Sequence, residues 1–132
     1  TPKRGGQLVL GQDQGPDRID PHGPGMALQH RLIVDGPYES LLRIDRNFNV
    51  HPSLATQWVM ESPTSYVFTI RDGVKFHDGR ALTSEDAKFT FERMANPPRE
   101  VKSPNQQLFK QIGRIETPDV KTIKIELVQP TA

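Results

Sequence analysis

Alternation of apolar and polar residues is the strongest pattern in the sequence. In residues 65–71 an apolar side chain recurs at every second position, and residues 122–128 show the same period of two; these positions are Tyr66, Phe68 and Ile70, then Ile123, Ile125 and Leu127. A period of two is typical of half-buried strands. Residues 57–61 and 114–117 are each separated from one of these segments by a Pro-containing turn, which predicts two antiparallel strand pairs.

One helix has clear start and stop signals. Thr83 is followed three residues later by Asp86, the pattern of a capped helix start, and Pro97-Pro98 ends helices. The sequence therefore predicts a helix from about Ser84 to Ala95, with an apolar stripe for packing; the stripe is Ala87, Phe91, Met94 and Ala95. A shorter helix is expected at residues 106–111.

Two weaker patterns lie in the first half of the chain. Apolar positions between Met26 and Leu42 fit helical spacing loosely, so we expect a helix there that is interrupted at Gly36-Pro37. The turn residues Asp45-Arg46-Asn47 lie between two short apolar segments and predict a small hairpin.

The N-terminal segment carries the candidate binding residues. Leu8-Val9-Leu10 is a short apolar run between glycines and predicts a buried strand. Residues 11–25 contain four Gly, three Pro and three Asp, so they form a loop, and loops longer than about 12–15 residues are usually functional or disordered. Because a loop directly after a central strand is placed to line a cleft, we expect Gln12, Asp13 and Gln14 to contact a ligand; an ordinary surface loop is the alternative.

Composition narrows the class of protein. The 132 residues suit one domain, and 34% of them are hydrophobic, enough for a modest core. The 17 basic and 16 acidic side chains are interleaved, which disfavours nucleic acid as a partner. Apolar runs are at most three residues long, so the sequence predicts no membrane span. The absence of cysteine excludes disulfides and thiolate catalysis.

Candidate chemistry in the sequence favours binding over catalysis. No Gly-x-Ser-x-Gly elbow or phosphate-binding Gly-rich motif is present, so we expect neither an enzyme nor a cofactor. The four histidines lack metal-ligand spacing, and His77-Asp78-Gly79 is interpreted as a turn rather than a metal site. Trp58, the single tryptophan, is expected to anchor the core.

The order of several motifs resembles a known family. They are Gly5-Gly6-Gln7-Leu8, Ile19-Asp20-Pro21, Tyr38-Glu39-Ser40-Leu41-Leu42 and Pro52-Ser53-Leu54-Ala55-Thr56-Gln57-Trp58, then the dense stretch from Tyr66 to Gly79 with Leu82-Thr83-Ser84-Glu85-Asp86, and finally Ile115-Glu116-Thr117-Pro118-Asp119. This pattern is similar to the extracytoplasmic solute-binding proteins of family 5, the dipeptide, oligopeptide and nickel-binding components of ABC importers.

The resemblance implies an α+β fold, an antiparallel sheet with one or two helices on a face, within the first lobe of a two-lobed periplasmic-binding-protein-like protein. It also implies that residues 1–132 are an N-terminal piece forming one α+β domain, with a lobe-core strand and cleft loop in about 1–25 and a decorating subdomain in about 26–132. The implied function is capture of peptides, or a related small solute, in an interlobe cleft and delivery to a membrane permease.

The same resemblance leaves location and context open. A transport receptor would be periplasmic or extracellular, and an upstream segment would anchor it through a lipid. The alternative is a ligand-sensing module of a regulatory protein with the same fold, because such modules are sometimes attached to DNA-binding domains. A scaffold without a ligand is a third interpretation.

Overall fold

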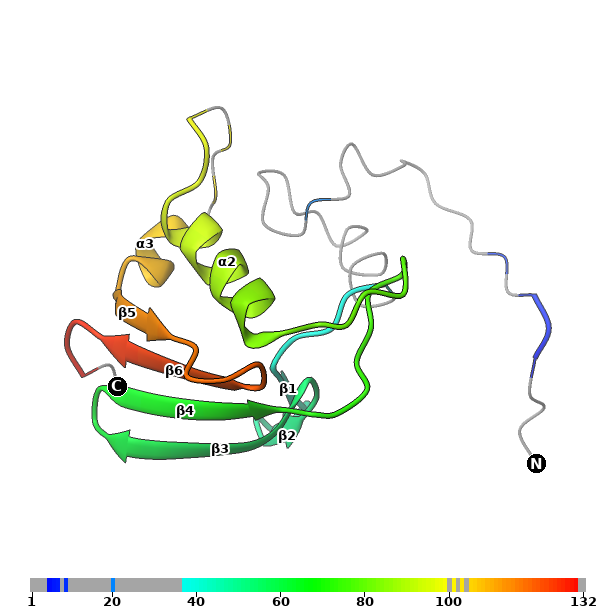
Figure 1. Ribbon diagram of the computed structural model, residues 1–132, viewed down its shortest axis with the longest axis horizontal. Coiled ribbons are helices and arrows are strands. Elements are labelled where there is room, and N and C mark those ends of the chain that lie inside the picture. Colours follow the sequence, from blue (N-terminus) through cyan, green and yellow to red (C-terminus); the bar gives the residue numbers. More distant parts are fainter. Residues whose placement is uncertain are drawn as a thin grey trace.

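A computed structural model describes residues 5–7, 9, 20, 37–99, 101, 103 and 105–130. Its elements are those of an α+β fold, as the sequence predicts (Figure 1). In chain order they are β1 (Leu42–Ile44), β2 (Val50–Pro52), β3 (Ala55–Ser62), β4 (Ser65–Ile70), α2 (Ser84–Ala95), α3 (Gln106–Phe109), β5 (Ile112–Glu116) and β6 (Thr122–Leu127).

The larger sheet is antiparallel and has the strand order β3-β4-β6-β5. The two predicted hairpins, β3-β4 and β5-β6, are both present, and they join through the central pair β4-β6. Phe68 is opposite Trp58 on one side and Ile123 on the other, so these three side chains share one face of the sheet. Helix α2 packs on that face against β6 and β5 (Figure 1).

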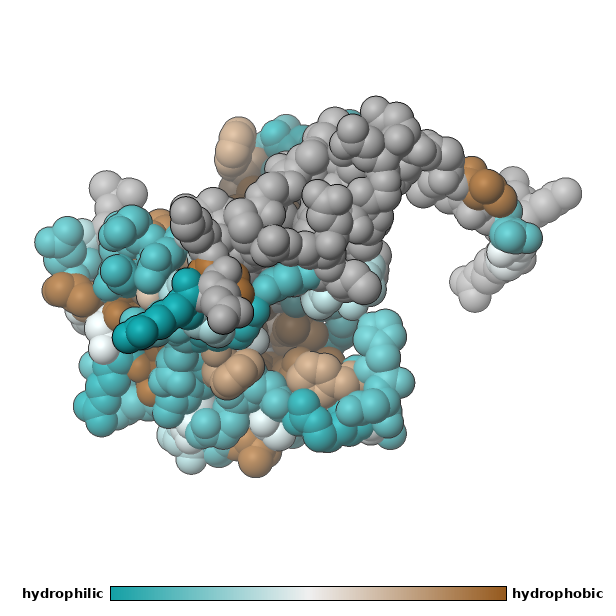
Figure 2. All heavy atoms as spheres, turned by 90° about the horizontal axis from the view of Figure 1, so that it is seen from above, coloured by the Kyte–Doolittle hydropathy of each residue, from teal (hydrophilic) through white to brown (hydrophobic). Residues whose placement is uncertain are grey.

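The core lies between this face and α2. Ile70, Ile123 and Ile125 are buried, and the alternation predicted for residues 122–128 is confirmed, because Lys124 between the two isoleucines is only half-buried. Partly buried apolar side chains complete the cluster; they are Leu41, Phe68, Leu82, Ala87, Phe91, Ile112 and Leu127. In Figure 2 hydrophobic residues are visible in the middle of the folded part, with hydrophilic residues around them.

Local signals place the ends of α2 correctly. The helix runs from Ser84 to Ala95 with Thr83 as its N-cap, and Thr83 and Asp86 form the predicted capping box. At the other end Asn96 donates its backbone N–H to the carbonyl of Glu92. The small hairpin is also confirmed, because β1 and β2 pair from Leu42 opposite Pro52 to Ile44 opposite Val50.

Trp58 is not the core anchor that the sequence suggested. It is 38% exposed, because β3 is an edge strand, whereas α2 packs on the same face of the sheet over β6 and β5, the two strands furthest from β3. Met94 is buried, as expected. The buried centre of the core is therefore aliphatic, and the tryptophan extends it towards the edge.

The expected helix over residues 26–42 is wrong at its C-terminal end. Residues 38–41 are not helical, and Leu42 begins β1. The carbonyls of Ser40 and Leu41 instead accept hydrogen bonds from Leu54 and Ala55, at 3.0 and 2.9 Å. Residues 26–36 lie outside the described residues. So does most of the strand expected near residue 8; Gln7 and Val9 are described, and neither is in a strand.

Candidate functional site

The predicted ligand residues Gln12, Asp13 and Gln14 lie outside the described residues. The structure does place Asp20, near the end of the same loop. Its Oδ2 atom accepts a hydrogen bond from Nη2 of Arg93, at 2.7 Å, and both side chains are about 30% exposed. Arg93 lies in the last turn of α2, where the helix dipole favours a cation. Asp20 therefore lies beside the last turn of α2.

A groove lies next to this end of α2, between the helix and the edge strand β5. Its volume is about 280 Å³. Apolar walls come from both elements, and polar side chains and one glycine complete the lining; the residues are Phe91, Glu92, Ala95, Asn96, Ile112, Gly113, Arg114 and Ile115. The register of β5 against β6 is interrupted between Ile112 and Arg114, which bends the strand at the groove.

The charged side chains that line the groove are paired with other side chains or exposed to solvent. Nη2 of Arg114 lies 2.6 Å from Oε1 of Glu116, and the Arg114 side chain is 68% exposed. The volume is just below the range of about 300–1,000 Å³ that is usual for ligand pockets. We do not assign this groove as the solute site.

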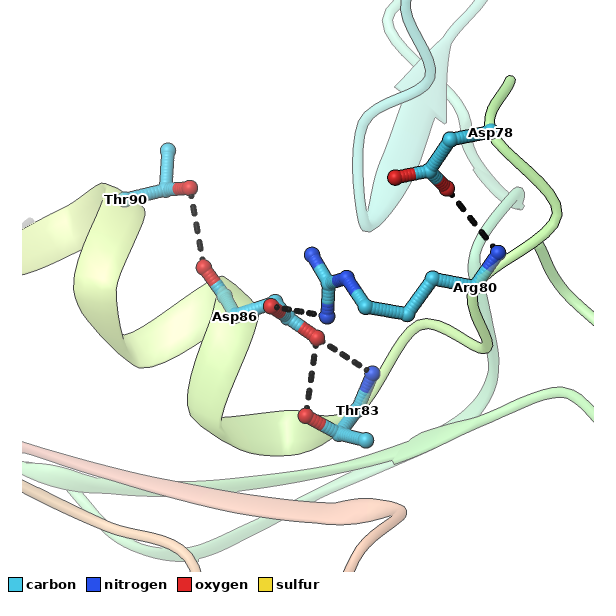
Figure 3. A network of polar contacts seen from close by, with 5 residues as sticks. All are labelled: Asp78, Arg80, Thr83, Asp86 and Thr90. Atoms are coloured by element: carbon cyan, nitrogen blue, oxygen red, sulfur yellow. Dashed lines mark hydrogen bonds and ion pairs between the residues drawn. The ribbon is translucent and has the colours of Figure 1, made fainter. Parts of the chain in front are cut away.

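A polar network fastens the start of α2 to the preceding loop (Figure 3). The Asp86 carboxylate accepts from the backbone N–H and from the hydroxyl of Thr83, both at 2.8 Å, and it pairs with Nη1 of Arg80 at 2.9 Å. The Arg80 backbone N–H donates to Asp78, and the Thr90 hydroxyl donates to the Asp86 carbonyl. Partial burial raises the pKa of Asp86, but these bonds to the carboxylate outweigh it and hold the pKa below its ordinary value.

The same loop contains the predicted turn. Gly79 has φ of +89° and donates its N–H to the carbonyl of Phe76, so His77-Asp78-Gly79 is a turn as expected. The Arg80 guanidinium lies 4.2 Å from the centre of the Phe76 ring, a cation–π contact. Nε2 of His77 lies 3.4 Å from the Pro37 carbonyl oxygen. Within the described residues, no group of three His, Cys, Asp or Glu side chains converges as metal ligands.

A second polar cluster was missed at the sequence level, where it was interpreted only as a turn. The Asp45 carboxylate accepts four hydrogen bonds, from the Asn47 and Asn49 backbones, the Asn49 amide and Nε2 of His51, at 2.8–3.0 Å. The bond from His51 is the largest of the effects that hold the pKa of Asp45 well below its usual range. The sequence pattern that could have predicted this cluster is Asp45 followed at two-residue intervals by Asn47, Asn49 and His51.

The described part of the chain thus has a groove, between α2 and β5, on an α+β frame. Solved structures of solute-binding proteins share this fold. NikZ from Campylobacter jejuni, in complex with Ni(L-His), matches 89% of this chain and 23% of its own with a TM-score of 0.75 and 28% identity. AgaA from A. tumefaciens R10, in complex with agropinic acid, matches 78% of this chain and 21% of its own with a TM-score of 0.70 and 30% identity. The class is that of solute-binding proteins.

The family follows from the sequence comparisons. Residues 49–132 match the model of the bacterial extracellular solute-binding proteins, family 5 Middle, and the chain belongs to this family. The glutathione-binding protein GsiB of Salmonella typhi is 32% identical over 113 residues, which are 85% of this chain and 22% of the relative. The chain thus spans about a fifth of the length of the curated relatives it matches. These relatives are solute-binding proteins rather than enzymes.

The helices give no sign of a membrane span. Among the described residues, no helix combines the length and apolarity needed to cross a bilayer.

Proposed function

We propose that the chain is part of the substrate-binding component of an ABC importer, which captures a peptide or a related small solute between two lobes and delivers it to a permease. The family match over residues 49–132 carries this proposal. The family's description as extracellular favours a transport receptor over a sensor attached to a DNA-binding domain, and it supports a periplasmic or extracellular location.

The relatives support a peptide-like ligand. GsiB is named for glutathione, which is itself a tripeptide. MppA, a periplasmic murein tripeptide-binding protein, has a TM-score of 0.72 and 26% identity with this chain. The ligand in the NikZ structure contains the amino acid histidine. We therefore infer a solute with free amino-acid groups, of which a short peptide is the leading candidate.

Gln12, Asp13 and Gln14 are the proposed ligand contacts within this chain. A carboxylate such as that of Asp13 attracts the ammonium group of a peptide, and the two amides can both donate to and accept from a peptide backbone. What supports this role is their place in the sequence, directly after the predicted strand. Asp20, a few residues further along, forms a hydrogen bond with Arg93 of α2.

Calorimetry on the complete gene product, with glutathione and mixed di- to pentapeptides, tests the proposal. The D13N variant should weaken binding about tenfold, as expected for a lost charge-assisted hydrogen bond, while stability changes by less than about 0.5 kcal/mol. D72N is the matched control, because the Asp72 side chain is 84% exposed and lies in a different turn. Absence of binding to every one of these ligands would refute the peptide assignment.

Two further experiments address catalysis and location. Mass spectrometry of the peptides after incubation should show no new product, because capture breaks no bond. Fractionation of the native host should recover the protein outside the cytoplasm. With an upstream lipid anchor, which we also propose, the protein stays with the membrane until detergent is added, and without that anchor osmotic shock alone releases it.

A further inference from the structure

The β1–β2 hairpin leaves one of its two faces apolar and uncovered. Ile44 and Val50 are directly opposite each other, and their side chains are 67% and 46% exposed. Arg43 and His51 are also opposite each other, one position along, so they lie on the other face of the ribbon. An exposed two-stranded ribbon with an aliphatic side and a charged side is amphipathic.

Phe48 at the tip of this hairpin is both exposed and strained. It is 86% exposed, and its φ of +63° makes it the one described residue other than glycine with a positive φ. A bulky side chain pays a conformational penalty in this region, which glycine avoids. The four hydrogen bonds to Asp45, together with the bond from the Phe48 N–H to the Asp45 carbonyl, hold the turn in place. The fold therefore exposes a large apolar ring to solvent from a turn whose backbone is held by hydrogen bonds.

Cations flank the same tip. Arg43 and Arg46 are both exposed, and neither forms an ion pair with any of the described residues. Asp45 is the single acid within residues 43–51, and its carboxylate already accepts hydrogen bonds from within the turn. The tip thus presents an apolar ring and two guanidinium groups that form no ion pair within the described part of the chain.

We propose that this hairpin tip, residues 43–51, contacts an anionic lipid surface, with Phe48 entering the acyl boundary and Arg43 and Arg46 meeting the headgroups. Size and shape favour lipid over a protein partner. A stable protein interface buries about 800 Å² on each side, which three apolar side chains at the tip of a ribbon do not supply. A fluid bilayer surrounds a small convex tip, and anionic headgroups attract arginines near the surface.

Co-sedimentation of the full chain with vesicles tests this inference. Vesicles of phosphatidylcholine and phosphatidylglycerol in equal parts should bind the chain, and vesicles of phosphatidylcholine alone should bind it less. The F48G variant should lose about tenfold in partitioning, as expected when a buried Phe side chain is removed. Replacing Arg43 and Arg46 by serine should cost about fivefold for each arginine and reduce the salt dependence.

Two features make the test selective. Gly suits the backbone conformation at position 48, so F48G should fold at least as stably as the parent chain, and a loss of vesicle binding cannot be a folding defect. F89A is the matched control, because Phe89 is 66% exposed on α2, away from the hairpin, and its removal should leave partitioning unchanged.

Three outcomes would overturn the inference. The first is equal binding of the chain to both kinds of vesicle. The second is an equal loss of vesicle binding in F48G and F89A. The third is that F48G binds vesicles as the parent chain does but self-associates more weakly in sedimentation velocity. The last result would show that the apolar face joins two copies of this chain. The inference stands apart from the proposed solute capture, since a chain that binds no peptide could still partition to anionic vesicles.

Discussion

Replacing Asp86 by alanine should destabilise the domain through the start of α2. The carboxylate makes two hydrogen bonds with Thr83 and an ion pair with Arg80, and the Asp86 side chain is only 22% exposed. Loss of a helix cap costs about 1 kcal/mol, and an ion pair with an exposed arginine contributes up to about 1 kcal/mol. We expect a total loss of about 2 kcal/mol in the free energy of unfolding.

Urea unfolding followed by far-UV circular dichroism measures this loss. D86N should lose less than D86A, because the amide oxygen still accepts from the Thr83 N–H. Adding R80A to D86A should cost only what the cation–π contact of Arg80 with Phe76 contributes, because the ion pair is already broken, and a double-mutant cycle then isolates the ion pair. F89A on the same helix should change stability by less than about 0.5 kcal/mol. A D86A loss no larger than that of F89A would refute the capping argument.

The contribution of Asp86 should also depend on pH. Its pKa is lower in the folded chain than in the unfolded one, so the folded state favours the ionised form. The stabilisation is therefore complete above the unfolded pKa of about 4 and is lost as the pH falls through the folded pKa. The difference in unfolding free energy between the parent chain and D86N should shrink as the pH falls below about 4. A difference that grows towards acid would contradict the assigned sign.

Four other variants test the core, the backbone strain at Phe48 and the ion pair between Lys124 and Glu61. I123A should lower the free energy of unfolding by about 2–5 kcal/mol, because Ile123 is fully buried. W58A should lower it by about 1–2 kcal/mol, because Trp58 is partly exposed and its removal leaves no closed cavity. If urea unfolding shows a larger loss for W58A than for I123A, the tryptophan is the core anchor after all. F48G should stabilise the chain by about 1 kcal/mol, measured by the same unfolding curves, and a loss would show that the ring packs in the folded state. In an NMR titration K124M should raise the pKa of Glu61, which the hydrogen bond and charge of Lys124 now lower; an unchanged pKa would mean that the 3.0 Å pair does not persist in solution.

Elements with local causes were predictable from the sequence. The ends of α2 depend on Thr83, Asp86 and the Pro97-Pro98 stop, all within a few residues of the helix. The faces of β6 depend on alternation, which a strand shows whatever it pairs with. The turn at Gly79 needs a positive φ that glycine adopts freely.

Features that depend on distant partners were not predictable. The exposure of Trp58 depends on which strand lies at the edge and on where α2 lies over the sheet. The sequence around Trp58 determines neither of these. The segment before β1 has helix-like spacing, yet the carbonyls of Ser40 and Leu41 bond to residues 54 and 55 instead. The proposed contacts Gln12, Asp13 and Gln14 stay predictions, because they lie outside the described residues.

The hairpin tip shows what a structure adds to a pattern that was already correctly interpreted. The sequence predicted a turn at residues 45–47, but many residues can close such a turn, and the pattern does not say which backbone angle each one adopts. The structure places a phenylalanine where glycine would be less strained, and it surrounds that strain with four hydrogen bonds to one carboxylate. Replacing Phe48 by glycine would relieve this strain, and the exposed Phe48 side chain contributes little to the core. A contact with an external partner therefore explains the strain better than a role in folding does.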